Sequence, residues 1–190
     1  MKSIVSEILE ESVRVQQRFV QDHLDRILSA ADRMASCLAS GHKILLFGNG
    51  GSAADAQHIA AEFVNRFRIE RPPLAALALT TDSSVLTSIG NDYHFDEIFS
   101  KQVRALGRRD DIAVGISTSG GSRNVLSAME AARAVGMFTM GFTGRGGQLA
   151  ETADLAFAVP SDTTARVQEA HALLGHLLCE LVDRILFPEG

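Results

Sequence analysis

Two glycine-containing loops carry the residues whose types and spacing are best suited to chemistry. Residues 117–122 (Ser-Thr-Ser-Gly-Gly-Ser) place four hydroxyls and two glycines directly before a helical pattern. Glycines let backbone N–H groups turn toward an oxyanion, the positive end of the helix dipole attracts it, and hydroxyls donate further hydrogen bonds. A helix N-cap needs one hydroxyl and this loop has four, so we expect an anion cradle rather than an ordinary turn capped by Ser122.

The other loop, residues 48–53 (Gly-Asn-Gly-Gly-Ser-Ala), matches the dinucleotide pattern G-x-G-x-x-A only weakly. A dinucleotide site also needs an acidic residue about 20 positions further on, at the end of the second strand. Asp82 comes too late for that role and is expected to cap the next helix. Neither loop is followed by the lysine of a nucleoside triphosphate site. The expected ligand is therefore a phosphate group on a small molecule.

His58 and Glu62 lie four residues apart in the helical pattern after residues 48–53, so imidazole and carboxylate share one face. Such a pair can share a divalent metal ion or a proton. The spacing alone is more typical of a solvent-facing polar pair, whereas the adjacent loop and the apolar residues around the pair favour a site. Asp55 and Gln57 are expected on other faces of this helix.

The last helical pattern contains Gln168, His171 and His176. Gln168 and His176 point roughly the same way, but the rise between them is about 12 Å. One metal ion is reached by both only through long side chains or through contributions from different chains. His171 lies on another face and is expected to be a structural or interface histidine. Surface positions are expected for the remaining histidines, His23, His42 and His94.

Five short apolar runs alternate with helical patterns and define the elements that must position these residues. The runs cover residues 44–47, 74–79, 112–116, 138–142 and 155–159, and the helical patterns cover residues 52–66, 82–89, 95–106, 122–135 and 163–187. This alternation predicts an α/β fold, a doubly wound, five-stranded parallel sheet flanked by helices. Ligands of such sheets bind at the carboxyl ends of the strands.

The first 40 residues have apolar side chains at three- and four-residue spacings and stop at Gly41. They predict an amino-terminal helical extension, as one long helix or two in succession. We expect residues 1–190 to form a single domain.

Composition sets the class of protein. The chain has 190 residues, 46 % of them hydrophobic, and a formal net charge of −5. These values are ordinary for a globular domain, and the negative charge disfavours a general nucleic-acid or membrane binder.

Cys37 and Cys179 lie far apart in helix-like sequence and are expected to be core residues in a reducing compartment. The charged amino terminus does not resemble a signal peptide, and no apolar run is long enough to cross a bilayer. We expect a cytoplasmic location.

Taken together, the motifs resemble those of the sugar isomerase (SIS) domain family, and within it the phosphoheptose isomerases. The resemblance is carried by residues 48–58 with Glu62 and by residues 79–82, 90–92, 115–120 and 165–171. It implies the SIS-type fold and an aldose–ketose isomerase that interconverts D-sedoheptulose 7-phosphate and D-glycero-D-manno-heptose 7-phosphate through an enediol. It also implies that the product supplies heptose for the core of bacterial lipopolysaccharide.

The same resemblance implies roles for individual residues. Glu62 is the expected base and His176 the expected acid. One zinc ion per site is expected, held by His58, Glu62, Gln168 and His176, although an amide is not among zinc's usual ligands. Arg123 departs from the family pattern and adds charge near the phosphate or lies on the surface. The expected substrate contacts are Asn49, Gly50, Gly51, Glu62, Asn91, Asp92 and Gln168, with Ser117, Thr118, Ser119 and Ser122 around the phosphate.

The family also implies a homotetramer with active sites at subunit interfaces, a phosphorylated seven-carbon sugar as the ligand, and no direct contact with membrane or nucleic acid. The alternative is a non-catalytic SIS-domain protein that binds the bacterial replication initiator, as one relative of these isomerases does. The set of His58, Glu62, Gln168 and His176 is complete here. A pure adaptor has no physical need for it, so the set favours the enzyme. A regulator that senses phosphosugars would need a DNA-binding segment that the given sequence does not carry.

Overall fold

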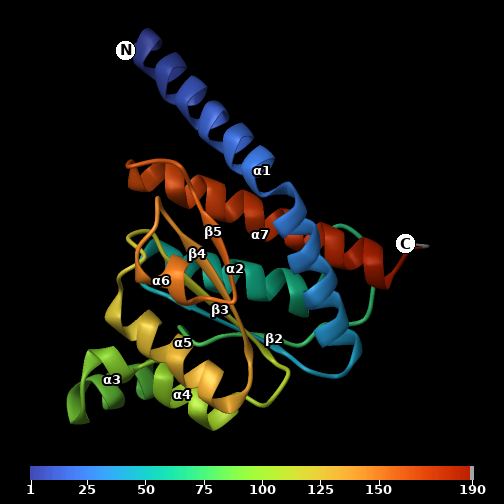
Figure 1. The fold of residues 1–190 in the computed structure, drawn as a ribbon, viewed down its shortest axis with the longest axis vertical. Helices are drawn as coiled ribbons and strands as arrows, with labels where there is room; N and C mark the ends of the chain where they lie inside the picture. Colours follow the sequence, from blue (N-terminus) through green and yellow to red (C-terminus); the bar gives the residue numbers. More distant parts are fainter. Residues whose placement is uncertain (189–190) are drawn as a thin grey trace.

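A parallel sheet of five strands lies at the centre of the computed structural model, which describes residues 1–188 (Figure 1). Its order is β2-β1-β3-β4-β5. The strands are β1 (Ile44–Gly48), β2 (Ala76–Ala78), β3 (Ile112–Ser117), β4 (Phe138–Thr143) and β5 (Leu155–Ala158). The predicted fold class, with its long amino-terminal helix, is confirmed.

The winding direction of the sheet reverses between β1 and β3. The chain moves outward from β1 to the edge strand β2 and then returns across β1 to form β3. The last pair of the β1–β3 register joins Gly48 to Ile116, so the loops that follow these two strands leave the sheet side by side. A reversal of this kind opens the crevice in which doubly wound sheets bind ligands. Both loops predicted to carry chemistry lie there.

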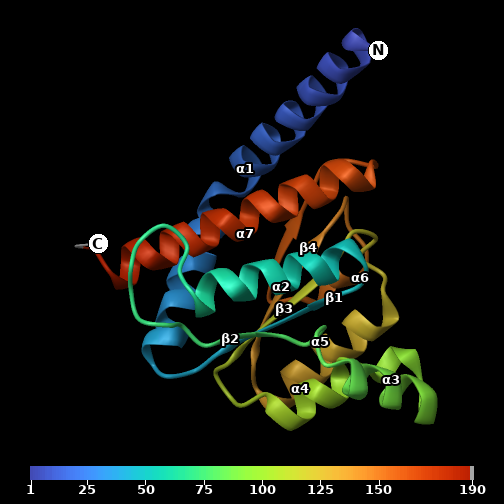
Figure 2. The ribbon, with the colours of Figure 1, turned by 180° about the vertical axis from the view of Figure 1, so that it is seen from behind.

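Helices cover both faces of the sheet (Figures 1 and 2). One face carries α1 (Lys2–Ala39), α2 (Gly51–Val64) and α7 (Thr164–Leu186). The other carries α3 (Ser83–Asp92), the short 3₁₀ turn η1 (Phe95–Glu97), α4 (Ser100–Leu106), α5 (Arg123–Val135) and α6 (Gln148–Thr152).

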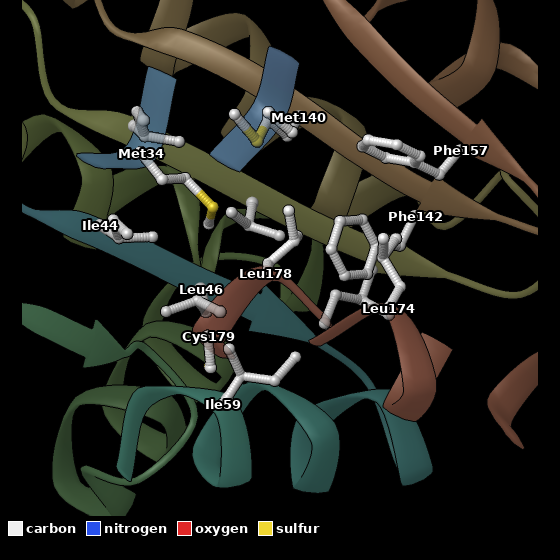
Figure 3. Packing of buried hydrophobic residues seen from close by; sticks show 14 of the residues in the cluster. Met34, Ile44, Leu46, Ile59, Met140, Phe142, Phe157, Leu174, Leu178 and Cys179 are labelled. Carbon is white, nitrogen blue, oxygen red and sulfur yellow. The ribbon is translucent and has the colours of Figure 1, made fainter. Parts of the chain in front are cut away.

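Alternation along the strands fills the two cores. Ile44 and Leu46 of β1 point to the α1–α2–α7 face, where they pack with residues such as Ile59 (Figure 3). Leu45 and Phe47 of the same strand point to the opposite core. Successive strand residues face opposite sides, so a strand covered on both faces must be apolar throughout. This requirement explains the uninterrupted apolar runs of the sequence.

The amino-terminal pattern forms one helix, which is one of the two predicted alternatives. The boundaries differ from expectation at three places. The edge strand β2, which pairs with β1, is shorter than residues 74–79. The predicted helix 95–106 is divided, since η1 ends before α4 begins. The short α6, which follows two glycines, was not predicted, because five residues are too few to show a helical period.

The two halves of α1 differ. Its carboxyl half is buried against the sheet, whereas its first two turns extend beyond the body of the protein and expose Ile4, Val5, Ile8 and Leu9 (Figure 1). No helix in residues 1–188 is long and apolar enough to cross a membrane.

Both cysteines are buried, as expected for core residues, and burial raises the pKa of the Cys37 thiol to about 11. His94 is exposed, as predicted, and His42 is partly buried beside Asp111. The expectation for His23 is wrong. This histidine is 8 % exposed, because it lies on the buried face of α1, where its Nδ1 pairs with the Phe19 carbonyl at 2.9 Å.

Helices α2 and α7 lie side by side across the sheet (Figure 2). Ile59 of α2 packs against Gly175 of α7. Beyond the end of α2, Arg71 forms a buried ion pair with Asp183 of α7 at 2.9 Å. The Arg71 guanidinium also donates to the carbonyls of Glu62 and Phe63, at 2.8 and 2.7 Å, and so satisfies the last turn of α2. This pair fixes α2 against α7.

Candidate active site

The loop after β3 is built as an anion cradle. The Ser117 hydroxyl lies 2.9 Å from that of Ser122 and 3.4 Å from that of Ser119. Ser122 is the N-cap residue of α5, but its side chain makes no capping bond. In the first turn of the helix, the Val125 N–H instead donates to the Asn124 side chain. Gly120 has φ +66°, and a Cβ there would overlap the Gly146 carbonyl, so only glycine allows this turn.

The loop after β1 leads directly into α2. The Asn49 carbonyl accepts from the Ser52 N–H at 3.0 Å and so begins the helix. Gln168 of α7 lies against Gly51, so closely that a Cβ at Gly51 would overlap the Gln168 amide nitrogen. Gln168 is therefore held at the amino-terminal end of α2.

The second cluster forms further along the same pair of helices. His58 Nε2 lies 3.0 Å from Glu62 Oε1, and His176 Nε2 of α7 lies 3.4 Å from His58 Nε2. The two imidazole rings meet edge to face, and the Phe67 ring lies 5.2 Å from that of His176. A third residue from another helix would not be expected at a solvated polar pair, so the geometry favours the interpretation of His58 and Glu62 as a site.

The donor set fits a divalent metal ion. One ligand atom from each of His58, Glu62 and His176 lies within 4.8 Å of the others. Two imidazole nitrogens about 2.0–2.1 Å from one tetrahedral zinc are separated by about the 3.4 Å found here. Gln168, the fourth predicted ligand, lies eight residues before His176 on α7, a rise of about 12 Å, and its side chain lies against Gly51 at the amino-terminal end of α2.

Asp55 was expected on another face, and that expectation is wrong. It lies three residues before His58, which is adjacent on a helix surface, and the two interact electrostatically. Its Oδ2 is buried and has no hydrogen-bond partner among the residues described. Burial raises the pKa of the Asp55 carboxyl, and the neighbouring His58 opposes that rise.

Two predicted sugar contacts lie elsewhere in the chain. Asn91 and Asp92 are exposed at the end of α3, where the Asn91 amide donates to Asp92 at 2.8 Å. In residues 1–188 no hydrogen bond joins them to either loop. Arg123 is exposed and its guanidinium lies 4.0 Å from the carboxylate of Asp96, so in one chain the surface interpretation applies.

Asn124 was missed from the sequence. Its amide and that of Asn49 donate to each other, at 2.8 Å in both directions, and Asn124 is only 3 % exposed. The two residues are 75 positions apart. No local spacing could have paired them, although both follow neighbouring strands.

His171 is a structural histidine. It is fully buried and donates from Nε2 to the Thr143 carbonyl at 3.1 Å, at the end of β4. Gly144, the residue after Thr143, donates its N–H to the carbonyl of Thr118 in the cradle at 3.1 Å. Burial lowers the pKa of His171 to about 4. His171 therefore supports, as a neutral group, the loop that backs the cradle.

A family model described as the SIS domain matches residues 8–144. The chain belongs to the SIS domain family. Within that family, its relatives include the phosphoheptose isomerase of Solidesulfovibrio magneticus, 59 % identical over 97 % of this chain and 90 % of the relative. The phosphoheptose isomerase of Nitratidesulfovibrio vulgaris is 57 % identical over 98 % of this chain and 90 % of the relative.

Solved structures give the same result. The phosphoheptose isomerase of Neisseria gonorrhoeae has a TM-score of 0.90 at 48 % identity, with 96 % of this chain and 98 % of that chain covered. The phosphoheptose isomerase of Francisella tularensis has a TM-score of 0.92 at 42 % identity, with 96 % and 97 % covered. The likeness to these two solved structures extends over nearly the whole chain.

The depressed pKa of His171 predicts a loss of stability in acid. Between about pH 6.5 and 4 the unfolded chain binds a proton at this residue and the folded chain does not, so the free energy of unfolding falls as pH is lowered. The contribution is about 3 kcal/mol for a pKa lowered from 6.5 to about 4. Denaturant unfolding of wild type and His171→Gln at pH 7 and pH 4 should show a smaller acid loss in the variant, with His94→Gln behaving as wild type. Equal losses in all three proteins would contradict this role.

Proposed function

We propose that the chain is an aldose–ketose isomerase that converts D-sedoheptulose 7-phosphate to D-glycero-D-manno-heptose 7-phosphate. The observation that carries the proposal is the meeting of Glu62 with His58 and His176 on α2 and α7. The other ends of these helices carry the glycine loop 48–53 and Gln168, beside the phosphate-type loop that follows β3. Relatives at 57–59 % identity that are named phosphoheptose isomerases support the choice of substrate.

The chemistry needs one base and one acid. The Glu62 carboxylate removes the proton from C1 of the ketose and returns it to C2, and His176 donates to and accepts from the oxygens of the enediol. Glu62 is positioned by His58, which contacts only one of its two carboxylate oxygens. Its side chain is 23 % exposed, so it is not closed off from a ligand.

The cradle formed by Ser117, Thr118, Ser119 and Ser122 holds the phosphate. Hydroxyls and N–H groups at the start of α5 supply the binding, so a chain of net charge −5 can still take an anionic substrate. Asn49, Gly50 and Gly51 contact the sugar nearest the cradle, and Asn91 and Asp92 reach it from another part of the assembly.

One zinc ion per site fits the same residues. His58, Glu62 and His176 would hold it, with Gln168 contributed by a different chain, because in its own chain the Gln168 side chain lies against Gly51 and the rise along α7 to His176 is about 12 Å. When bound, such an ion acts as a Lewis acid that polarises the carbonyl and stabilises the enediolate.

The active site is shared between subunits of a homotetramer. Gly51 and Glu62 are eleven residues apart, about 16 Å along α2, so the cradle and the acid–base cluster of one chain lie toward opposite ends of that helix. The exposed apolar side chains of α1 provide a surface for association.

The product supplies heptose for lipopolysaccharide core, a role that rests on the family resemblance. The expected cytoplasmic location rests on the charged amino terminus, the short apolar runs and the two separated cysteines of the sequence. The cluster of Glu62, His58 and His176 gives no support to the non-catalytic alternative that binds a replication initiator.

Replacing the base tests the reaction. Wild-type protein supplied with sedoheptulose 7-phosphate should yield the aldose, and Glu62→Gln should lower kcat by about 10²–10⁴-fold because the amide cannot accept the proton. Product formation is followed by chromatography of the sugar phosphates. Glu70→Gln, in an exposed ion pair with Arg66, is the matched control and should keep the wild-type rate. Absence of product from wild type, or full rate in Glu62→Gln, would refute the proposal.

Zinc binding is tested without an activity assay. Metal-free protein titrated with Zn²⁺ and analysed by elemental mass spectrometry should take up one ion per chain. His58→Ala and His176→Ala should each lose it, because either change leaves too few ligands. His94→Ala removes an exposed histidine of another segment and should bind as wild type does. Uptake that is the same in all four proteins would place the metal elsewhere.

Mixed oligomers test the shared site. Glu62→Gln and the double variant Ser119→Ala/Ser122→Ala should each be nearly inactive alone. Co-assembly should restore about a quarter of the sites, by random assortment at a symmetric interface, because some sites then combine an intact cradle with an intact Glu62. Native mass spectrometry confirms that mixed assemblies form. Mixed assemblies without recovered activity, or a stable monomer in sedimentation, would rule out sharing.

A further inference from the structure

We propose that Asn124 is a positioning residue, which through Asn49 fixes the loop after β1 against the phosphate cradle after β3. The inference rests on the isomerase function proposed above, because it assumes that these two loops hold one sugar phosphate between them. It assigns a role to a residue that contacts neither the reacting carbons nor the acid–base cluster.

The geometry is that of a reciprocal amide pair. Asn124 Nδ2 donates to Asn49 Oδ1, and Asn49 Nδ2 donates to Asn124 Oδ1, both at 2.8 Å. Asn124 Oδ1 also accepts from the Val125 N–H at 2.9 Å. This third bond sets the orientation of the Asn124 amide, because a rotated amide would turn a donor toward the N–H group. The orientation of the Asn49 amide then follows from that of Asn124.

The pair is placed where the backbone no longer joins the two loops. The β1–β3 ladder ends at Gly48 and Ile116, one residue before Asn49. Beyond this point no further ladder bond ties the loops together. The two side-chain bonds continue the connection past the edge of the sheet, into the crevice at the switch point.

Each partner is fixed in the loop that it holds. The Asn49 carbonyl accepts from Ser52 and begins α2, so moving Asn49 moves the Gly50–Gly51 backbone. Asn124 lies in the first turn of α5, two residues after Ser122 of the cradle. Asn124 is 3 % exposed, so water cannot readily replace Asn49 as its partner, and the loss of these two hydrogen bonds is costly. A change in either asparagine should therefore move the sugar end of the site relative to the phosphate end.

The positioning role is distinguished from a direct contact of Asn49 with the sugar by a double-mutant cycle. The variants are Asn49→Ala, Asn124→Ala and the double alanine variant. Asn65→Ala is the matched control, because its exposed amide makes no hydrogen bond in residues 1–188. Isomerase kinetics are measured, together with calorimetric binding of sedoheptulose 7-phosphate and of inorganic phosphate, and melting temperature monitors folding.

If the pair positions the loops, Asn49→Ala and Asn124→Ala each lower kcat/KM for the sugar phosphate by about 10²-fold. The double variant should be no worse than the more severe single variant, because one interaction is lost in all three. Asn49→Ala should bind inorganic phosphate as tightly as wild type, since the cradle is unchanged. Asn124→Ser keeps an acceptor for the Val125 N–H without reaching Asn49, and provides the same comparison if Asn124→Ala does not fold.

Losses that multiply in the double variant, or wild-type kinetics in both Asn124 variants, would overturn the positioning role. Failure of the isomerase proposal gives a different pattern. A wild-type protein that makes no aldose but binds the sugar phosphate refutes that activity, and the cycle is then read from the binding affinities. Wild-type protein that binds neither compound contradicts both proposals.

Discussion

The packing of α2 against α7 is the contact on which the candidate site depends. His58 and Glu62 share a face of α2 through their spacing, but His176 joins them only because the two helices lie side by side. The buried ion pair of Arg71 and Asp183 holds the two helices together near their carboxyl-terminal ends. Removing one partner of such a pair leaves an uncompensated buried charge, which costs about 3–5 kcal/mol. The same guanidinium bonds the Glu62 carbonyl, so the pair also fixes the end of α2 that carries the base.

The same two helices separate the parts of the site. Gln168 is held against Gly51 near the cradle, and His176 lies about 12 Å further along α7. A rigid helix holds their backbones this far apart, so only long side chains or a second chain bring these groups to one point. This spacing is the basis for proposing a site shared with a second chain, and the exposed apolar turns of α1 are the surface proposed for that association.

Local patterns were sufficient to predict the fold and the pairing of His58 with Glu62. The apolar runs gave the strands, because a doubly covered sheet needs them, and i,i+4 spacing paired His58 with Glu62. Contacts between distant residues could not be predicted from local patterns. The Asn49–Asn124 pair joins residues 75 positions apart, and the burial of His23 depends on which face of α1 meets the sheet. The prediction that Asp55 lies on another face of α2 was wrong although the sequence contained the signal, because residues three apart are neighbours on a helix surface.

Proton transfer by Glu62 is the central claim, and isotope exchange tests it most directly. The reaction is run in D₂O and the aldose is examined by NMR for deuterium at C2. Because Glu62 is 23 % exposed, the proton that it carries exchanges with solvent, so wild-type product should contain deuterium at C2. Glu62→Gln should incorporate deuterium into neither the product nor the substrate. Product that keeps its original hydrogen throughout, or equal exchange in Glu62→Gln, would contradict the account.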